Sequence, residues 1–417
     1  MFKNKLLKHT GIYTISNLVA AAIPFFLLPF LTVHLSPEAY AKVDIFYIFI
    51  QFLIPFIGLN SHSAIIRLYF DSKEKGDFSS YVYNSILITF LTTILTVFLV
   101  LLSIKSLENF LSLPYSWILY AIPTTFALNI AQIILAIWQT KNKSINFGLF
   151  RISRSLIEIL ISIILVGSYS MDWEGRTLGQ FLSYMLFLII AFYFIYKEVG
   201  IGKYNKIHFI EIVKYGTPLI LHVLGAIIMT YSDRFFIKNM VDLKQVGYYS
   251  VGYQIGMIIY FLQNSFNQAW TPWLYSKLKS FNKEVKTQIE KYITYYFISI
   301  FFIAFFLWII TPFIFKIFIS EQFQPSIQFV PWIVFGFAFN GMYKMFAGFL
   351  FFTKSTTTIS FITLATALIN IILNYFFINT FGAKGAAIAS TVSFMFQFIL
   401  TWLVSRKYYQ INWLKIW

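Results

Sequence analysis

Long apolar segments recur along almost the whole 417-residue chain, and they constrain its fold more than any other feature. A helix of about 20 apolar residues is long enough to cross the hydrocarbon layer of a membrane. The pattern therefore predicts an all-α integral membrane protein with twelve transmembrane helices. The predicted spans lie near residues 11–35, 44–66, 80–104, 115–139, 147–168, 177–196, 214–238, 247–271, 291–315, 327–352, 358–379 and 385–405.

The composition excludes several other classes of protein. Only 12% of residues are charged, against about 25% in soluble domains, which leaves too few polar groups to cover a water-facing surface. The absence of cysteine excludes disulfides and thiolate metal sites. The five histidines show no metal-ligand spacing, so neither a metal nor a cofactor is predicted.

Lysine and arginine are distributed unequally between the two sides of the predicted membrane. With the N-terminus inside, 23 of the 32 fall on the cytoplasmic side and 8 on the outer side, and Lys344 lies within a span. Cytoplasmic loops carry the excess of positive charge, so both termini are predicted in the cytoplasm. The net charge of +16 is thus a topology signal, and no nucleic-acid partner is predicted.

The two halves of the chain resemble each other. The segment 138–166 aligns with 351–377, which places Thr140-Lys141 on Thr353-Lys354, and LSPEAYAKVDIFYIF parallels VDLKQVGYYSVGYQI. Each repeat predicts a six-helix bundle, residues 1–203 and 204–417, with a pseudo-twofold axis along the membrane normal and a central cleft. This plan is typical of transporters, although a duplication can also be a structural relic.

Four stretches resemble, in order and spacing, the motifs of one transporter family. They are GLNSHSAIIRLYFD at the end of span two, YGTPLILHVLGAIIMTYSDRFFI in span seven, NQAWTPWLY at the end of span eight and FGAKGAAIASTVSF at the start of span twelve. The chain resembles the Wzx-type O-antigen and polysaccharide flippases of the multidrug/oligosaccharidyl-lipid/polysaccharide exporter superfamily. One departure is Ala41, where the family usually has glycine.

The resemblance implies a transporter rather than an enzyme. Its substrate would be an undecaprenyl-pyrophosphate-linked oligosaccharide, such as the O-antigen repeat unit used in lipopolysaccharide biosynthesis. The protein would move it between leaflets of the bacterial inner membrane by alternating access, driven by protons or sodium. Membrane lipids, a polysaccharide polymerase and a chain-length regulator are the further partners considered.

Two alternative functions stay open at this point. A drug/cation antiporter of the same superfamily would favour acidic residues within the lobes, whereas the charge within these spans is mostly positive. A membrane polysaccharide polymerase or ligase would usually present a large outer loop, and the outer gaps between these spans are short.

Charged residues in or near the spans are the candidate site residues, because burying charge in hydrocarbon is costly and usually functional. The cationic candidates for binding pyrophosphate are Arg67, Arg151, Arg154, Arg234, Lys238 and Lys344. The candidates for ion coupling are Glu158, His222 and Asp233. Arg67 either selects headgroups or only marks topology.

Span five places Arg151, Arg154 and Glu158 on one helical face. The alternative to headgroup binding is an internal Arg154–Glu158 pair with Arg151 reaching the inner surface. Their predicted equivalents in the second repeat are Leu364, Ala367 and Ile371.

Span seven ends with Asp233 and Arg234, placed at its outer end. Arg234 and Lys238 share a face and repel each other unless an anion lies between them. Asp233 points about 100° from Arg234 and is not expected to pair with it. It shares a stripe with His222, which suits ion coupling. The alternative is a buried histidine bonded to a carbonyl and an aspartate paired with a loop cation.

Lys344 is the charge that is hardest to explain structurally. It precedes Lys354 by ten residues, which places it about 15 Å inside the cytoplasmic end of its span. A lysine stem is too short to reach the surface from there. The position predicts either a cavity or a carboxylate partner.

Overall fold

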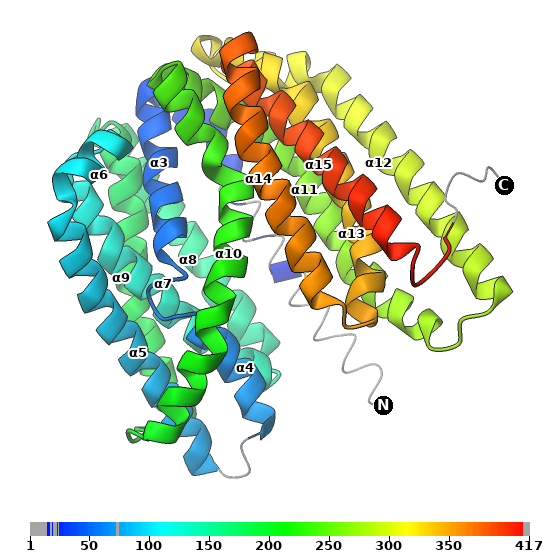
Figure 1. The fold of residues 1–417 in the computed structure, drawn as a ribbon. Coiled ribbons are helices and arrows are strands. Elements are labelled where there is room, and N and C mark those ends of the chain that lie inside the picture. Colours follow the sequence, from blue (N-terminus) through cyan, green and yellow to red (C-terminus); the bar gives the residue numbers. More distant parts are fainter. Residues whose placement is uncertain (1–14, 17–18, 20–22, 24, 72–74, 412–417) are drawn as a thin grey trace. The chain divides into compact units, whose positions relative to one another are not determined.

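The computed structural model describes residues 15–16, 19, 23, 25–71 and 75–411, and within these ranges it consists of helices without strands (Figure 1). Helices suit apolar segments because a membrane offers no water to their backbone N–H and C=O groups. The helices of the first half are α2 (Leu28–His34), α3 (Pro37–Leu53), α4 (Ser61–Asp71), α5 (Lys75–Leu102), α6 (Ile104–Leu111), α7 (Tyr115–Thr140), α8 (Ser144–Ile163) and α9 (Trp173–Val199). Those of the second half are α10 (Lys206–Met240), α11 (Leu243–Leu278), α12 (Lys283–Phe318), α13 (Val330–Phe352), α14 (Thr356–Phe381) and α15 (Lys384–Ser405). A π-helix η1 (Ile164–Ser168) extends α8, and a 3-10 helix η2 (Glu321–Phe329) precedes α13.

Eight helical segments in the described ranges are long and apolar enough to cross a membrane. In each segment we compare the most apolar stretch of 18 residues. Of this stretch, 72% is buried inside the protein in Tyr115–Thr140 and in Glu321–Phe352, whereas 24–44% is buried in the other six segments. α7 and α13 therefore form the centres of their bundles. The count of twelve spans stays a prediction.

The chain divides into two compact units. One comprises Met1–Leu35 and Lys42–Ile227, and the other comprises Ser36–Ala41 and Ile228–Trp417. α10 contributes its first part to one unit and its last part to the other. The division at residues 203 and 204 stays a prediction about the repeats.

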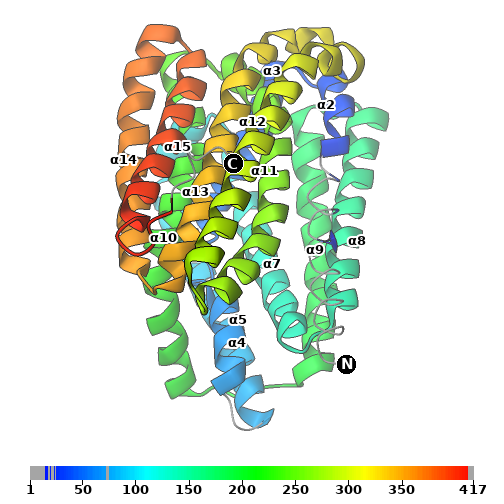
Figure 2. The same cartoon turned by 90° about the vertical axis from the view of Figure 1, so that its right-hand side faces the viewer.

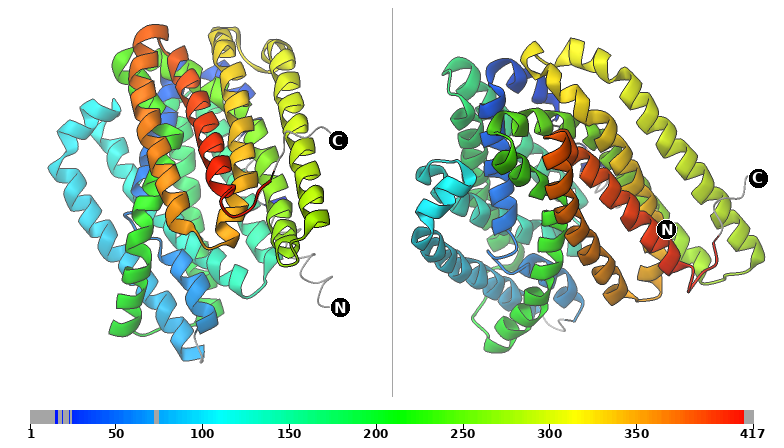
Figure 3. Two further views of the ribbon diagram at one scale, coloured as in Figure 1. Left: turned by 45° about the vertical axis from the view of Figure 1, so that its right-hand side comes forward. Right: turned by 45° about the horizontal axis from the view of Figure 1, so that its top comes forward.

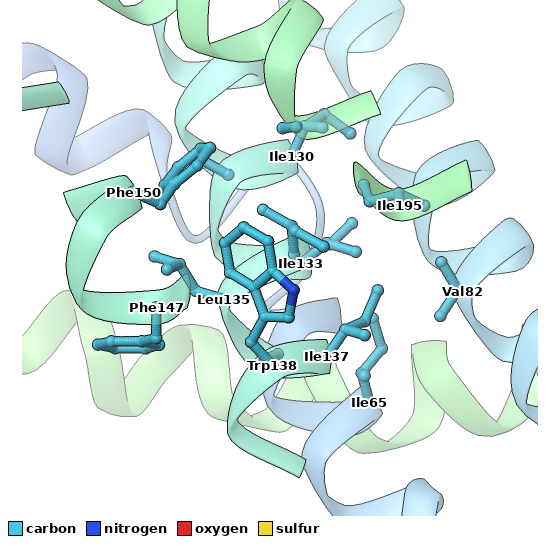
Figure 4. Close-up of a cluster of buried hydrophobic side chains, with 14 of the residues drawn as sticks. Ile65, Val82, Ile130, Ile133, Leu135, Ile137, Trp138, Phe147, Phe150 and Ile195 are labelled. Carbon is cyan, nitrogen blue, oxygen red and sulfur yellow. The ribbon is translucent and has the colours of Figure 1, made fainter. Parts of the chain in front are cut away.

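In the first unit, α7 packs against α4, α5, α8 and α9, and α8 and α9 run side by side (Figure 2). Trp138 of α7 lies at the centre of its apolar core, with Phe150 and Ile133 around the ring (Figure 4). The indole Nε1 donates to Glu198 Oε1 at 3.0 Å. Lys141 and Lys143 bind the same carboxylate at 3.2 and 2.7 Å. The turn between α7 and α8 is thereby fastened to the end of α9.

In the second unit, α13 packs against α11, α12 and α15, and α14 lies along α15 (Figure 3). α13 ends with a bond from Ser355 N to Leu350 O around the left-handed Lys354. α7 ends in the same way, with Lys143 N bonded to Trp138 O around the left-handed Asn142. The two turns therefore have the same geometry, in which Lys354 matches Asn142 and not the predicted Lys141, a shift of one residue. The repeat of six helices stays a prediction.

This shift changes the equivalents of the charged residues on α8. Arg151, Arg154 and Glu158 correspond to Thr363, Thr366 and Asn370, and not to the predicted Leu364, Ala367 and Ile371. Thr366 and Asn370 are both buried. Both repeats thus keep polar side chains at these positions, charged in one repeat and neutral in the other.

The second predicted parallel, between LSPEAYAKVDIFYIF and VDLKQVGYYSVGYQI, stays a prediction, although both segments begin a helix with a side-chain cap. The Ser36 hydroxyl accepts a bond from Ala39 N before α3, and the Asp242 carboxylate accepts one from Gln245 N before α11. Such side-chain caps satisfy N–H groups that have no partner within the helix.

The continuous span predicted at 44–66 is wrong, because α3 and α4 are separate helices. Gly58, Leu59 and Asn60 between them have φ values of 87°, 47° and 53°, which an α-helix excludes. Gly58 N donates to Thr92 Oγ1 of α5 at 2.9 Å. Irregular backbone at membrane depth needs such polar partners.

Candidate functional site

Asp233 and Arg234 form a buried ion pair near the end of α10, in the second unit. Arg234 Nη1 lies 2.8 Å from Asp233 Oδ1, and each residue is only 2% exposed. Tyr249 of α11 donates its hydroxyl to Asp233 Oδ2, and Ser390 of α15 lies 3.5 Å from the same oxygen. Asp233 is therefore held by three helices.

The expectation that Asp233 and Arg234 do not pair is wrong. Side chains on a helix lean toward its N-terminus, and the Arg234 stem is long enough to fold back over the preceding turn. Its Nη1 donates to Thr230 O at 2.8 Å as well as to Asp233. The guanidinium lies 3.9 Å from the ring centre of Tyr253 and 4.9 Å from that of Tyr249. Arg234 is thus both ion-paired and stacked on two aromatic rings.

Amide and hydroxyl groups continue this cluster onto α14. Ser232, next to Asp233, donates to Asn370 Oδ1 at 3.4 Å, and Asn370 Nδ2 donates to Ser393 Oγ at 3.2 Å. Asn374 Nδ2 bonds to the Asn370 side chain at 3.0 Å, while its buried Oδ1 has no partner among the described residues. Carboxylate, amide and hydroxyl oxygens suit a proton or a small hard cation, and in this structure the Arg234 guanidinium occupies one oxygen of the carboxylate.

Two other candidates lie on α10. Lys238 lies in the last turn of the helix, where the negative end of the helix dipole favours a cation. The His222 side chain lies outside what the structure describes, so its predicted stripe with Asp233 remains untested.

Lys344 of α13 contacts two residues of α11. Its Nζ lies 2.5 Å from Asn264 Oδ1 and 4.8 Å from the ring centre of Tyr260. Within the described residues no carboxylate lies within ion-pair distance of Lys344. The lysine is therefore solvated by a neutral amide and an aromatic face, and its charge is not neutralised by them.

Glu158 of α8 is the centre of a charged cluster in the first unit. Its two carboxylate oxygens lie 2.6 Å from Arg154 Nη1 and 2.7 Å from Arg176 Nη2 of α9. Arg176 also donates to Ser162 Oγ at 3.1 Å, and the Arg154 guanidinium lies 4.4 Å from the ring centre of Tyr184. The predicted Arg154–Glu158 pair is confirmed, but Arg176 was not predicted to join it.

Replacing Glu158 with alanine is expected to lower the amount of folded protein. Two arginines would lose their shared partner, and breaking a buried ion pair costs about 3–5 kcal/mol. The measurement is the thermal unfolding midpoint of the purified protein, with Glu174→Ala on α9 as a control carboxylate outside the cluster. An unchanged midpoint would show that the cluster does not stabilise the fold.

Two further predicted cations of the first unit lie beside aromatic rings. Arg151 lies one turn before Arg154, with its guanidinium 5.7 Å from the ring centre of Phe147. Arg67 is exposed on α4, 5.7 Å from the ring centre of Tyr215. The sequence analysis missed Arg176, Tyr253, Tyr260, Asn264 and Asn370. The signal in the sequence that could have indicated these residues is the recurrence of polar residues at helical spacing within the apolar segments.

Sequence comparison places these features in a known context. The profile of a family described as polysaccharide biosynthesis protein matches residues 6–279, and the MatE profile matches residues 218–376. Protein 1 of the Lsg locus of Haemophilus influenzae is 23% identical over 365 residues, which cover 85% of this chain and 87% of the relative. A Shigella flexneri protein provisionally named an O-antigen transporter is 23% identical over 271 residues, 63% of each chain.

Solved transporters have the same fold. An inward-facing multidrug resistance transporter of the MATE family and MOP superfamily aligns with a TM-score of 0.77 and 15% identity, covering 95% of this chain and 94% of its own. The lipid II flippase MurJ, in an inward closed conformation, aligns with a TM-score of 0.72 and 18% identity, covering 97% and 87%. The predicted all-α membrane transporter fold is confirmed.

Proposed function

The chain belongs to the polysaccharide biosynthesis protein family, and from this premise we propose that it is a flippase for an undecaprenyl-pyrophosphate-linked oligosaccharide. The cargo is the repeat unit of an O-antigen or another surface polysaccharide. It crosses the bacterial inner membrane from the cytoplasmic to the periplasmic leaflet by ion-coupled alternating access. The provisional name of the Shigella flexneri relative and the fold shared with a lipid II flippase support the proposal.

The observation that carries the proposal is the environment of Lys344. An ammonium with an amide and an aromatic face around it, and no described carboxylate nearby, is a poor structural element in a membrane helix. It is a suitable partner for a pyrophosphate. A drug/cation antiporter would place an anion at such a position to receive a cationic drug.

We assign ion coupling to Asp233 rather than to Glu158. Both carboxylate oxygens of Glu158 are occupied by arginines. Asp233 has one arginine and otherwise hydroxyl partners, next to an amide cluster with an unfilled acceptor. The coupling ion in this proposal is a proton or sodium.

The proposed orientation places both termini in the cytoplasm, and reporter fusions test it. Fusions after Lys143, Lys206 and Lys286 should report the cytoplasm, and fusions after Lys105, Lys244 and Glu321 should report the periplasm. The reason is the excess of lysine and arginine on the first set of gaps. A consistent inversion at all six sites would contradict the orientation.

Deletion of the gene should abolish long-chain surface polysaccharide, because repeat units would remain facing the cytoplasm. The measurement is a silver-stained gel of surface polysaccharide together with the amount of glycosylated undecaprenyl pyrophosphate in the membrane. Complementation with the intact gene is the control. Single repeat units displayed outside would indicate a polymerase, and unchanged polysaccharide with raised drug sensitivity would indicate a drug exporter.

A further inference from the structure

α11 carries a stripe of polar and aromatic residues that the charged clusters do not account for. With 3.6 residues per turn, five residues of its second half fall within a sector of about 80°. We call these residues the α11 stripe: Tyr260, Asn264, Asn267, Thr271 and Tyr275. Tyr249 and Tyr253, which contact the Asp233–Arg234 pair, lie in the same sector nearer the start of the helix.

The polar atoms of the α11 stripe are largely unused within the protein. Asn264 Oδ1 accepts from Lys344, and Asn267 Oδ1 is 3.5 Å from the hydroxyl of Thr271 on the same helix. The Nδ2 groups of both asparagines, and the hydroxyls of Tyr260 and Tyr275, find no partner in the described part of the chain. All five stripe residues are half-buried.

These unused groups indicate that the stripe does not face lipid. A polar group without a partner costs several kcal/mol in hydrocarbon. Helix packing explains such residues only where they bond across helices, and among the stripe residues Asn264 does so, to Lys344. The remaining groups therefore face water or a polar ligand.

The chemistry of the stripe matches a carbohydrate. A sugar ring has apolar C–H faces and a rim of hydroxyls. Tyrosine offers an apolar ring with a polar end, asparagine offers two donors and an acceptor, and threonine offers both roles in one hydroxyl. From Tyr260 to Tyr275 the stripe extends for about 22 Å, which is long enough for several sugar residues in a row.

We propose that the α11 stripe binds the oligosaccharide of the cargo, while Lys344 binds its phosphate at the Tyr260 end of the stripe. This assignment rests on the proposed function and adds the surface that recognises the glycan. It explains why one helix of 36 residues combines tyrosines and amides on a single face. Asn267 and Tyr275 are then specificity-determining residues.

The test is a binding measurement on the full-length protein in lipid nanodiscs. The two probes are undecaprenyl pyrophosphate and the lipid-linked oligosaccharide extracted from the host membrane. Wild-type protein should bind the glycosylated lipid more tightly. Asn267→Ala and Tyr275→Leu should each reduce that preference about tenfold, the value of one or two lost hydrogen bonds or ring contacts, with unchanged affinity for the bare lipid.

Ser265→Ala is the matched control, because Ser265 lies about 120° around α11 from the centre of the stripe and bonds to Phe261 O of its own helix. It should keep the wild-type preference. The assignment would be overturned if the stripe variants kept the preference for the glycosylated lipid, or if they weakened the binding of both probes equally. A wild-type protein that binds the bare lipid without preferring the glycan would overturn it too, with the proposed function intact. Binding of neither probe would contradict the proposed function itself.

Discussion

Lys344→Ala is expected to abolish polysaccharide export while the protein remains in the membrane at its normal level. The ammonium is held by Asn264 Oδ1 and the Tyr260 ring, and no described carboxylate would be orphaned by its removal. Loss of the cation would remove the charge that meets the pyrophosphate, and a charge-assisted contact contributes about 1.5–3 kcal/mol, or roughly 10- to 150-fold. The measurement is surface polysaccharide together with membrane abundance.

Two further variants separate charge from structure at this position. Lys344→Arg keeps the charge but must fit a larger group beside Asn264, so it should retain part of the export. Lys316→Ala removes an exposed lysine at the end of α12 and should have no effect. Full export by Lys344→Ala would show that the lysine does not bind cargo, and loss of the protein itself would show a structural role.

The apolar pattern predicted the helices well, since hydrocarbon imposes helical structure on any long apolar segment. It did not predict the break between α3 and α4, although Pro55, Gly58 and the polar residues 60–63 lie there, because helix-breaking residues also occur inside continuous membrane helices. The break depends on partners such as Thr92, which is distant in the sequence. The alignment of the two halves was based on their identical Thr-Lys pairs. The geometry of the two turns, which the sequence does not show, shifts this alignment by one residue.

Contacts at the candidate sites could be predicted where both residues lie on the same helix. Arg154 and Glu158 are four residues apart on one helix, so their pairing follows from helical spacing. Arg176 and Asn264 come from other helices, and a single sequence does not indicate which helices pack together. The pairing of Asp233 with Arg234 was excluded from the angle between adjacent residues, which neglects how far an arginine side chain can fold back.

Asp233→Asn is expected to abolish export and to reduce the amount of folded protein. Asparagine can still accept bonds from Tyr249 and Ser390, but Arg234, 2% exposed, would lose its counter-charge. An uncompensated buried charge costs about 3–5 kcal/mol. Because this loss would obscure any role in ion coupling, export by the single variant cannot assign the residue.

The neutral pair Asp233→Asn/Arg234→Gln separates the two roles. The double variant leaves no uncompensated buried charge, which is the main cost of the single variant, so the amount of folded protein should rise toward the wild-type level. If Asp233 couples the ion, export stays absent. The wild-type unfolding midpoint, unlike that of the neutral pair, should then rise with sodium or with proton concentration, since a ligand that binds only the folded state stabilises it. If the pair is only structural, export returns with the fold, and ion coupling must be sought outside this cluster.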